Sequence, residues 1–309
     1  MKNPLILALI ILIAGGCSSN SLLFKFKMPD KANFRYAITV DQDIATSTMG
    51  MDQDQKVNEM VEYEYEVLKS LPDGAKDMKV TITAVATEQS SPMGGAKYDS
   101  RVDQNPQDVT GKIYEKMVGQ AFRMTMNADG KVKEVTGADK MLEEMLAAAG
   151  FPEGDETSQA FESTLKTQFG NKAMAEDMSM LTAFYPDKPI KPGDTWEKTV
   201  TREAGIGMII TTTYKLMSRG KGKAYIDFSS EIASLPDAPP VNFGVMNVEY
   251  DLSGQQTGSM IVDEATGWAE ESEVHQKFGG DMKISGPELP FGTINGTMEA
   301  KSVIRVIRQ

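Results

Sequence analysis

Most of the chain alternates apolar and polar residues with a period of two, a pattern typical of half-buried β-strands. The alternation predicts strands over residues 22–27, 34–40, 61–67, 78–86, 122–126 and 131–135. It returns in the second part of the chain, over residues 195–201, 208–217, 224–232, 245–252, 257–262, 268–278 and 294–307. Short turns such as Pro72-Asp73-Gly74 join the early strands, and no strand–helix–strand unit separates them. We therefore expect an antiparallel meander.

Residues 138–184 follow a helical period instead. Three apolar stripes recur at helical spacing: Met141, Leu142, Met145 and Leu146; Phe161, Leu165 and Phe169; and Met174, Met178 and Leu181. Gly150 suits the end of the first helix, and Thr157 suits the start of the second. Such stripes are typical of helices that pack on a sheet.

These patterns predict a mainly β, α+β fold of curved antiparallel sheets. A first β half spans residues 24–137, a helical segment spans 138–184, and a second β half spans 185–309, together forming one compact unit. The second half resembles the first. Residues 65–70 are similar to 214–218, and residues 124–130 are similar to 260–267. We therefore expect an internal duplication in which the two halves have loops of different length.

The first residues have the layout of a secretory signal peptide. Lys2 supplies a positive start, residues 5–13 form an apolar run too short to span a bilayer, and Ala14-Gly15-Gly16 precede Cys17. The small residues before Cys17 resemble the lipobox of bacterial lipoproteins. This resemblance implies cleavage after residue 16, acylation of Cys17 and a short lipidated tether over 17–23. Ser18, where a retained lipoprotein would have aspartate, implies sorting to the outer membrane.

The composition of the chain excludes several classes of function. A formal net charge of −12 argues against nucleic acid as a partner. Cys17 is the only cysteine, so an acylated chain has no thiol left for a disulfide or for catalysis. The single histidine, His275, lies on a predicted strand among charged residues, where a solvated role is expected. No nucleophile, zinc-protease or phosphate-loop motif is present. We expect a protein that is not an enzyme and has no cofactor.

Two groups of residues are considered as metal sites. The acidic cluster of Asp41, Asp43, Asp52 and Asp54 lacks the spacing of a calcium loop, and solvated strand edges explain it better. Three Met-x-Met pairs, at Met49/Met51, Met124/Met126 and Met178/Met180, could suit Cu(I). Core packing explains such pairs better, because residues two apart on a strand share one buried face and those two apart on a helix diverge. We therefore expect no metal.

The chain resembles an uncharacterised family of bacterial lipoproteins that carry a domain of unknown function. The resemblance rests on Cys17 with its lipobox, on the opening Leu23-Phe24-Lys25-Phe26-Lys27, and on Pro189-Ile190-Lys191-Pro192-Gly193-Asp194-Thr195-Trp196. It implies no catalytic residues. The Pro-to-Trp segment itself suits a turn followed by a tryptophan that anchors a strand in the core.

The chain has 21 methionines, whose flexible side chains suit adaptable apolar surfaces. A methionine-rich curved sheet covered by helices could enclose an apolar pocket for a lipid-like ligand. The candidate lining is Phe122, Met124, Met126, Met141, Met145, Phe161 and Leu165. The alternative is a structural or interaction protein of the cell envelope, whose acidic surface contacts another envelope protein. In both cases the lipid on Cys17 would hold the protein at the membrane.

Overall fold

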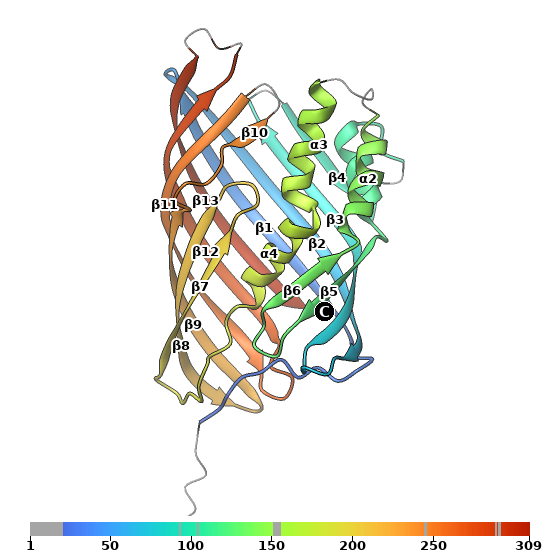
Figure 1. Ribbon diagram of the computed structural model, residues 1–309, viewed down its shortest axis with the longest axis vertical. Coiled ribbons are helices and arrows are strands. Elements are labelled where there is room, and N and C mark those ends of the chain that lie inside the picture. The colour runs from blue at the N-terminus through green and yellow to red at the C-terminus, as the bar shows by residue number, and fades with distance from the viewer. Residues whose placement is uncertain are drawn as a thin grey trace, which may run out of the picture.

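The computed structural model describes residues 21–92, 94–103, 105–150, 156–243, 246–287, 289 and 292–309, apart from the side chains of 156–161 (Figure 1). The first part of the chain contributes β1 (Asn33–Thr48), β2 (Met51–Ser70), β3 (Lys76–Ser91), β4 (Gly94–Asp99), β5 (Ala121–Met126) and β6 (Val132–Thr136). The second part contributes β7 (Thr195–Arg202), β8 (Met208–Gly220), β9 (Lys223–Ser234), β10 (Val241–Phe243), β11 (Met246–Asp263), β12 (Ala269–Ser285) and β13 (Thr293–Arg308).

All the described strands belong to one antiparallel sheet. Its order is β6-β5-β3-β2-β1-β13-β12-β11-β9-β8-β7, with β4 paired to β3 and β10 paired to β11. The expected fold class, an antiparallel curved β structure with a few helices, is confirmed. The first and last long strands, β1 and β13, pair in the middle, so the two predicted halves form a single sheet (Figure 1).

Several strands are longer than the alternation predicts. β1 and β2 continue to a two-residue hairpin at Met49 and Gly50, both with positive φ. Their far halves were missed because inward positions there, such as Gln42, are polar. β11 is one strand where two were predicted, because residues 253–256, between the two predicted strands, have no apolar side chain to continue the alternation. A Cβ on Gly258 would lie 2.5 Å from the Phe228 ring, so this glycine makes room for the ring within the strand.

Four helices lie among the described residues: α1 (Val109–Met117), α2 (Ala138–Ala149), α3 (Glu156–Phe169) and α4 (Asn171–Thr182). The last three occupy the predicted helical segment. α1 was not predicted, although Asp108 caps it by accepting a hydrogen bond from the backbone N–H of Gly111. No helix in the described ranges is long and apolar enough to cross a membrane.

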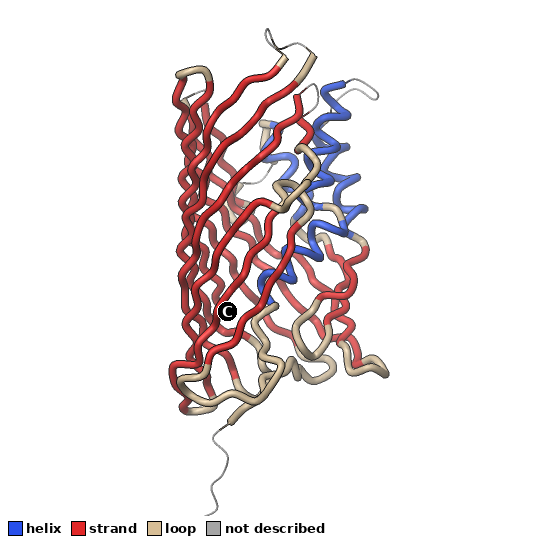
Figure 2. The backbone as a smooth tube through the Cα atoms, turned by 60° about the vertical axis from the view of Figure 1, so that its left-hand side comes forward, coloured by secondary structure: helices blue, strands red, loops and turns tan. Residues whose placement is uncertain are grey.

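Helix α4 occupies the gap between the two edge strands of the sheet. It contacts both β6 and β7, which do not pair with each other (Figures 1 and 2). Toward β7, Arg202 forms an ion pair with Asp177 of α4 at 2.8 Å. Toward β6, the Thr182 hydroxyl donates to the carbonyl of Gly130 at 2.6 Å. The helix therefore completes an enclosure that the sheet leaves open.

The two halves share their irregularities as well as their strand order. β2, β3, β5 and β6 neighbour one another in the first half as β8, β9, β11 and β12 do in the second. The first hairpin of each set has a bulge residue before its turn, Leu68 and Met217. The last hairpin of each set also has one after its turn, Lys133 and Glu270. Bulges at matching places support the internal duplication inferred from sequence.

One end of the molecule, here called the closed end, contains the β2–β3, β5–β6, β8–β9 and β11–β12 turns and is crossed by residues 22–28 (Figure 1). The backbone N–H of Phe26 donates to Ala128 at 2.8 Å, and that of Lys27 donates to Thr266 at 2.7 Å. Phe24 and Phe26 are almost fully buried, and Phe26 packs against Trp268. The N-terminal segment is thus part of the core at this end.

Candidate functional site

The interior between the sheet and the helices contains a cavity of about 510 Å³. Its walls come from the inward faces of the sheet and from α1, α2, α3 and α4. Most wall side chains are aliphatic, aromatic or methionine, for example Ile38, Val40, Val274, Ile304, Val306 and Met178. This volume lies within the range of pockets that bury small molecules.

A continuous row of polar side chains crosses the inner face of the sheet. Each member lies directly opposite the next on the neighbouring strand, from β1 through β13, β12, β11, β9 and β8 to β7. This polar row comprises Gln42, Ser302, Gln276, Gln256, Ser230, Thr212 and Lys198. Because strand side chains alternate between faces, the positions two residues away on either side face the same interior.

Apolar residues flank the polar row on both sides. Toward the closed end lie Val40, Ile304 and Val274, which line the cavity. On the other side, a second core cluster includes Ile232 and Phe278, separate from the main core. The row therefore divides two apolar regions of one interior.

Most members of the row are paired. The Gln42 amide donates to the Ser302 hydroxyl at 3.1 Å, and the buried hydroxyls of Thr212 and Ser230 are 2.8 Å apart. Lys198 forms an ion pair with Asp187 at 2.6 Å. The Thr212–Ser230 contact satisfies two buried hydroxyls, as a stable interior requires, and the other two contacts pair groups that are partly exposed.

Two amides in the row are different. Gln256 and Gln276 face each other across β11 and β12 and line the cavity. Within the described part of the chain, no group forms a hydrogen bond with either side chain. Each amide offers two donors and one acceptor oxygen to whatever occupies the cavity.

A carboxyl group also lies on the cavity wall. Glu59 of β2 accepts a hydrogen bond from the hydroxyl of Tyr114 of α1 at 3.1 Å. Burial raises the pKa of Glu59, and the hydrogen bond from Tyr114 offsets part of that effect. Burial also raises the pKa of Tyr114. The cavity therefore disfavours negative charge at this point.

The predicted pocket residues divide between the cavity and the core beside it. Met124 and Met141 line the cavity. Phe122, Met126, Met145 and Leu165 are instead buried in the main core and are not among the cavity residues. The helical stripe and the strand alternation mark burial, and for these four residues the burial is packing within the main core. The side chain of Phe161, like Cys17, lies outside the described residues.

The structure also places the other candidate residues. The described residues contain no group of three or more His, Cys, Asp or Glu side chains arranged to hold a metal. Met124 and Met126 are buried, whereas Met49 and Met51 are each 60% exposed at a hairpin tip. His275 is exposed and lies 2.8 Å from Glu273. Trp196 is buried at the start of β7, as the sequence predicted.

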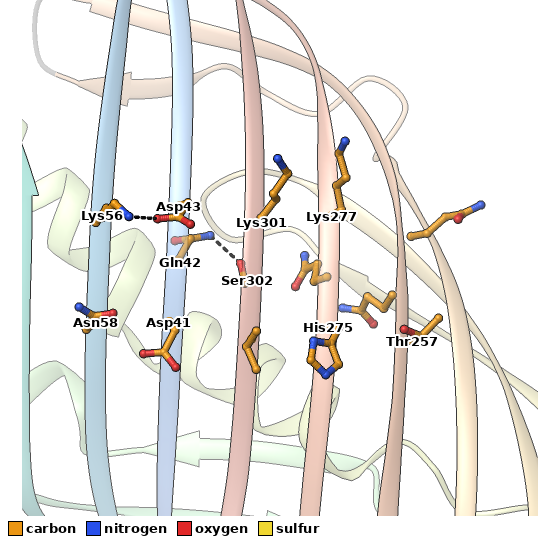
Figure 3. A pocket seen from close by; sticks show the side chains of 14 residues that line it. Asp41, Gln42, Asp43, Lys56, Asn58, Thr257, His275, Lys277, Lys301 and Ser302 are labelled. Atoms are coloured by element: carbon orange, nitrogen blue, oxygen red, sulfur yellow. Dashed lines mark hydrogen bonds and ion pairs between the residues drawn. The ribbon is translucent and has the colours of Figure 1, made fainter.

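The outward face of the central strands is charged. A shallow depression there is lined by residues that include Asp41, Lys56, His275 and Lys277, with Lys56 3.4 Å from Asp43 (Figure 3). The acidic cluster predicted from the sequence thus lies partly on this solvated face. The contrast with the inner face places the apolar chemistry inside the sheet.

Sequence reasoning missed Glu59, Tyr114 and the polar row. An available signal was the repeated occurrence of glutamine, serine or threonine at inward positions of successive strands. Finding it required the strand register, which a single sequence does not supply.

A protein-family model described as a family of unknown function (DUF6263) matches residues 73–269. At this coarser level the expected uncharacterised family is confirmed. The matched range includes the Pro189–Trp196 segment and does not reach Cys17. No curated protein matches the chain.

Among solved structures, one on lipid–protein interactions in lipovitellin is similar, with 9% identity and a TM-score of 0.46 over 92% of this chain. The chain spans only 25% of that lipovitellin chain. Pseudomonas aeruginosa OpdQ is 6% identical, with 90% of this chain and 99% of that chain covered and a TM-score of 0.22. Pseudomonas aeruginosa OccK7 (OpdD) is 7% identical over the same shares, with a TM-score of 0.24. At these scores the likenesses carry no conclusion about function.

Proposed function

We propose that this chain, which belongs to the family of unknown function DUF6263, binds an apolar, lipid-like ligand without chemical change, while its lipidated Cys17 holds it at the outer membrane of the cell envelope. The observation that carries the proposal is the cavity of about 510 Å³ with its largely aliphatic, aromatic and methionine wall. Burial of apolar ligand surface is worth about 25 cal/mol per Å², so such a wall suits a hydrocarbon chain.

The polar groups on the wall fit binding. They are amides, hydroxyls, the Glu59–Tyr114 pair and cations such as Arg202 that are already held by carboxylates. A few such groups in an apolar cavity fix the orientation of a ligand. The rival role, an envelope protein that contacts a partner through its acidic exterior, makes no use of this interior.

The test is fluorescence of the uncharged probe N-phenylnaphthylamine with the intact chain held in amphipol. We expect saturable binding to the wild type and weaker binding in Val274→Trp, because the indole would occupy part of the cavity of about 510 Å³. Val303→Trp is the matched control. Val303 lies on β13, opposite His275 of β12, and both face outward, so the added indole would not enter the cavity.

Lipid extraction from protein purified out of its host provides the second measurement. A bound lipid that is retained by Val303→Trp and reduced in Val274→Trp would support the proposal. Equal probe binding in both variants, or none in the wild type, would contradict it. If probe binding gives one of these contradicting results and the protein crosslinks to a defined envelope protein, the rival role is favoured.

A further inference from the structure

The unpaired amides of Gln256 and Gln276 say more about the ligand than the apolar wall does. They lie opposite each other at one level of the cavity, in a row whose other members are paired. An amide that faces an apolar space without a partner is costly. Water can satisfy both amides in the free protein, and a ligand with hydrogen-bonding atoms at this level replaces that water at little loss.

The residues beside Gln256 and Gln276 indicate where along the ligand its hydrogen-bonding group lies. Val274 and Ile304 lie one step toward the closed end. On the other side of the polar row, Ile210 and Met208 of β8 continue the apolar wall of the cavity. A ligand that occupies the cavity on both sides of the row therefore places apolar groups on both sides of the two amides. Its hydrogen-bonding group is internal rather than terminal.

The charges of the cavity favour an uncharged ligand. Lys198 and Arg202 are engaged by Asp187 and Asp177, so an anionic head would have to displace a carboxylate from one of them. Glu59, on the same wall, would repel an anion whenever it is ionised. Neutral amides, in contrast, match the carbonyl oxygen of an ester or an amide as donors.

We propose that the cavity selects uncharged lipids in which an ester or amide linkage lies at Gln256 and Gln276, with hydrocarbon on both sides. This inference rests on the proposed function, because it specifies the ligand of the same cavity. The Gln256 and Gln276 side chains donate hydrogen bonds to the carbonyl of the linkage.

Three probes of similar length test the inference by displacing N-phenylnaphthylamine from the intact chain: octyl nonanoate, whose ester is internal, octadecane and hexadecanoate. We expect the ester to bind about tenfold more tightly than octadecane, the ratio for about 1.4 kcal/mol of net hydrogen bonding. Hexadecanoate should bind more weakly than the ester.

The variant Gln256→Met/Gln276→Met keeps side-chain length and removes the hydrogen bonds. It should lose the preference for the ester and retain the affinity for octadecane, which also shows that it folds. Gln255→Met, on the exposed opposite face of β11, is the matched control and should keep the preference.

Equal affinity of the wild type for ester and octadecane would overturn the selectivity while leaving the apolar cavity supported. So would a preference that survives in the double variant, or tightest binding of hexadecanoate. Absence of any probe binding would overturn the proposed function itself, and the inference with it.

Discussion

The hydroxyl of Tyr185 donates a hydrogen bond of 2.7 Å to the backbone carbonyl of Gly267, which lies 82 residues further along the chain. Tyr185 follows the helices and is 1% exposed, while Gly267 lies in the β11–β12 turn. The hydrogen bond therefore holds the segment that joins the helices to the second half against the closed end. Desolvation of the buried Tyr185 side chain raises its pKa, so the phenol stays a donor.

Tyr185→Phe should lower the free energy of unfolding by about 1–2 kcal/mol, because the carbonyl of Gly267 loses its partner in a dry environment. Urea denaturation measures the change. Tyr225→Phe is the control, since Tyr225 is 40% exposed and its removal should have almost no effect. Equal effects of the two substitutions would show that the buried hydrogen bond contributes nothing.

Gly267→Ala should be among the most damaging single substitutions in the chain. A Cβ there would lie 1.9 Å from the carbonyl oxygen of Lys25, and φ is +72°. We expect a loss of about 3 kcal/mol or more, which thermal unfolding would detect.

Gly222→Ala isolates the backbone contribution, since its φ is +76° and nothing lies within 4 Å of the added carbon. That variant should lose only about 1 kcal/mol. If Gly267→Ala is no worse, the close approach of residues 22–28 to the closed end is incorrect.

Thr212→Val should cost about 1–3 kcal/mol, because it leaves the buried Ser230 hydroxyl without its 2.8 Å partner. The double variant Thr212→Val/Ser230→Ala should recover part of the loss, as both polar groups are then removed. Thr211→Val breaks the exposed Thr199–Thr211 contact at 3.1 Å and should be nearly neutral. A double-mutant cycle by chemical denaturation measures the coupling, and additive losses would contradict a buried pair.

Glu59→Gln should change how stability depends on pH. Because the pKa of Glu59 is raised from 4.5, the folded state holds this proton more tightly than the unfolded state does. The stabilising contribution is complete below the ordinary pKa and is lost as the pH rises through the raised value. The variant should therefore gain in melting temperature relative to wild type as the pH increases above 4.5.

Glu64→Gln, on the outer face of the same strand, is the control with the opposite sign. Hydrogen bonds from Asn33 and Arg35 lower the pKa of Glu64, so its contribution is present above the ordinary pKa and lost as the pH falls. If the melting temperatures of the two variants, relative to wild type, change with pH in the same direction, the result would contradict a desolvated Glu59.

Cys17→Ser should release the protein from the membrane fraction, because acylation of Cys17 is the proposed anchor. Metabolic labelling with a fatty-acid analogue should mark the wild type and not the variant. Ser18→Ala is the control and should leave both the label and the fractionation unchanged. A variant that remains labelled would place the lipid elsewhere.

The sequence predicted the elements better than their arrangement. Alternation located most strands, and the stripes at Met141 and Phe169 located helices, because burial on one face leaves a periodic trace. That β1 pairs with β13 depends on contacts between the chain ends, which no local pattern encodes. Helix α1 was missed because its buried face has only three residues, Gly111, Ile113 and Met117.

The sequence predicted the chemical character of the candidate site but identified few of its residues. An apolar interior was expected, and Met124 and Met141 line the cavity. Most wall residues come from strands, where Val40, Val274 and Ile304 look like any buried strand residue. Whether such positions pack together or enclose space depends on strand curvature and on where α4 lies, and both are set by tertiary packing.

The N-terminal segment has a consequence for the route a ligand must take. Residues 22–28 are packed into the closed end, and Leu22 pairs with Ile190 through two backbone hydrogen bonds. Along β1, Gln42 lies six residues beyond Tyr36, or roughly 20 Å at the rise of a strand. If an acyl chain on Cys17 is inserted in a bilayer next to the closed end, the aromatic core around Trp268 lies between that bilayer and the amides of Gln256 and Gln276. An ester lipid bound there would have left the bilayer completely, so its transfer would depend on how fast it desorbs from its donor.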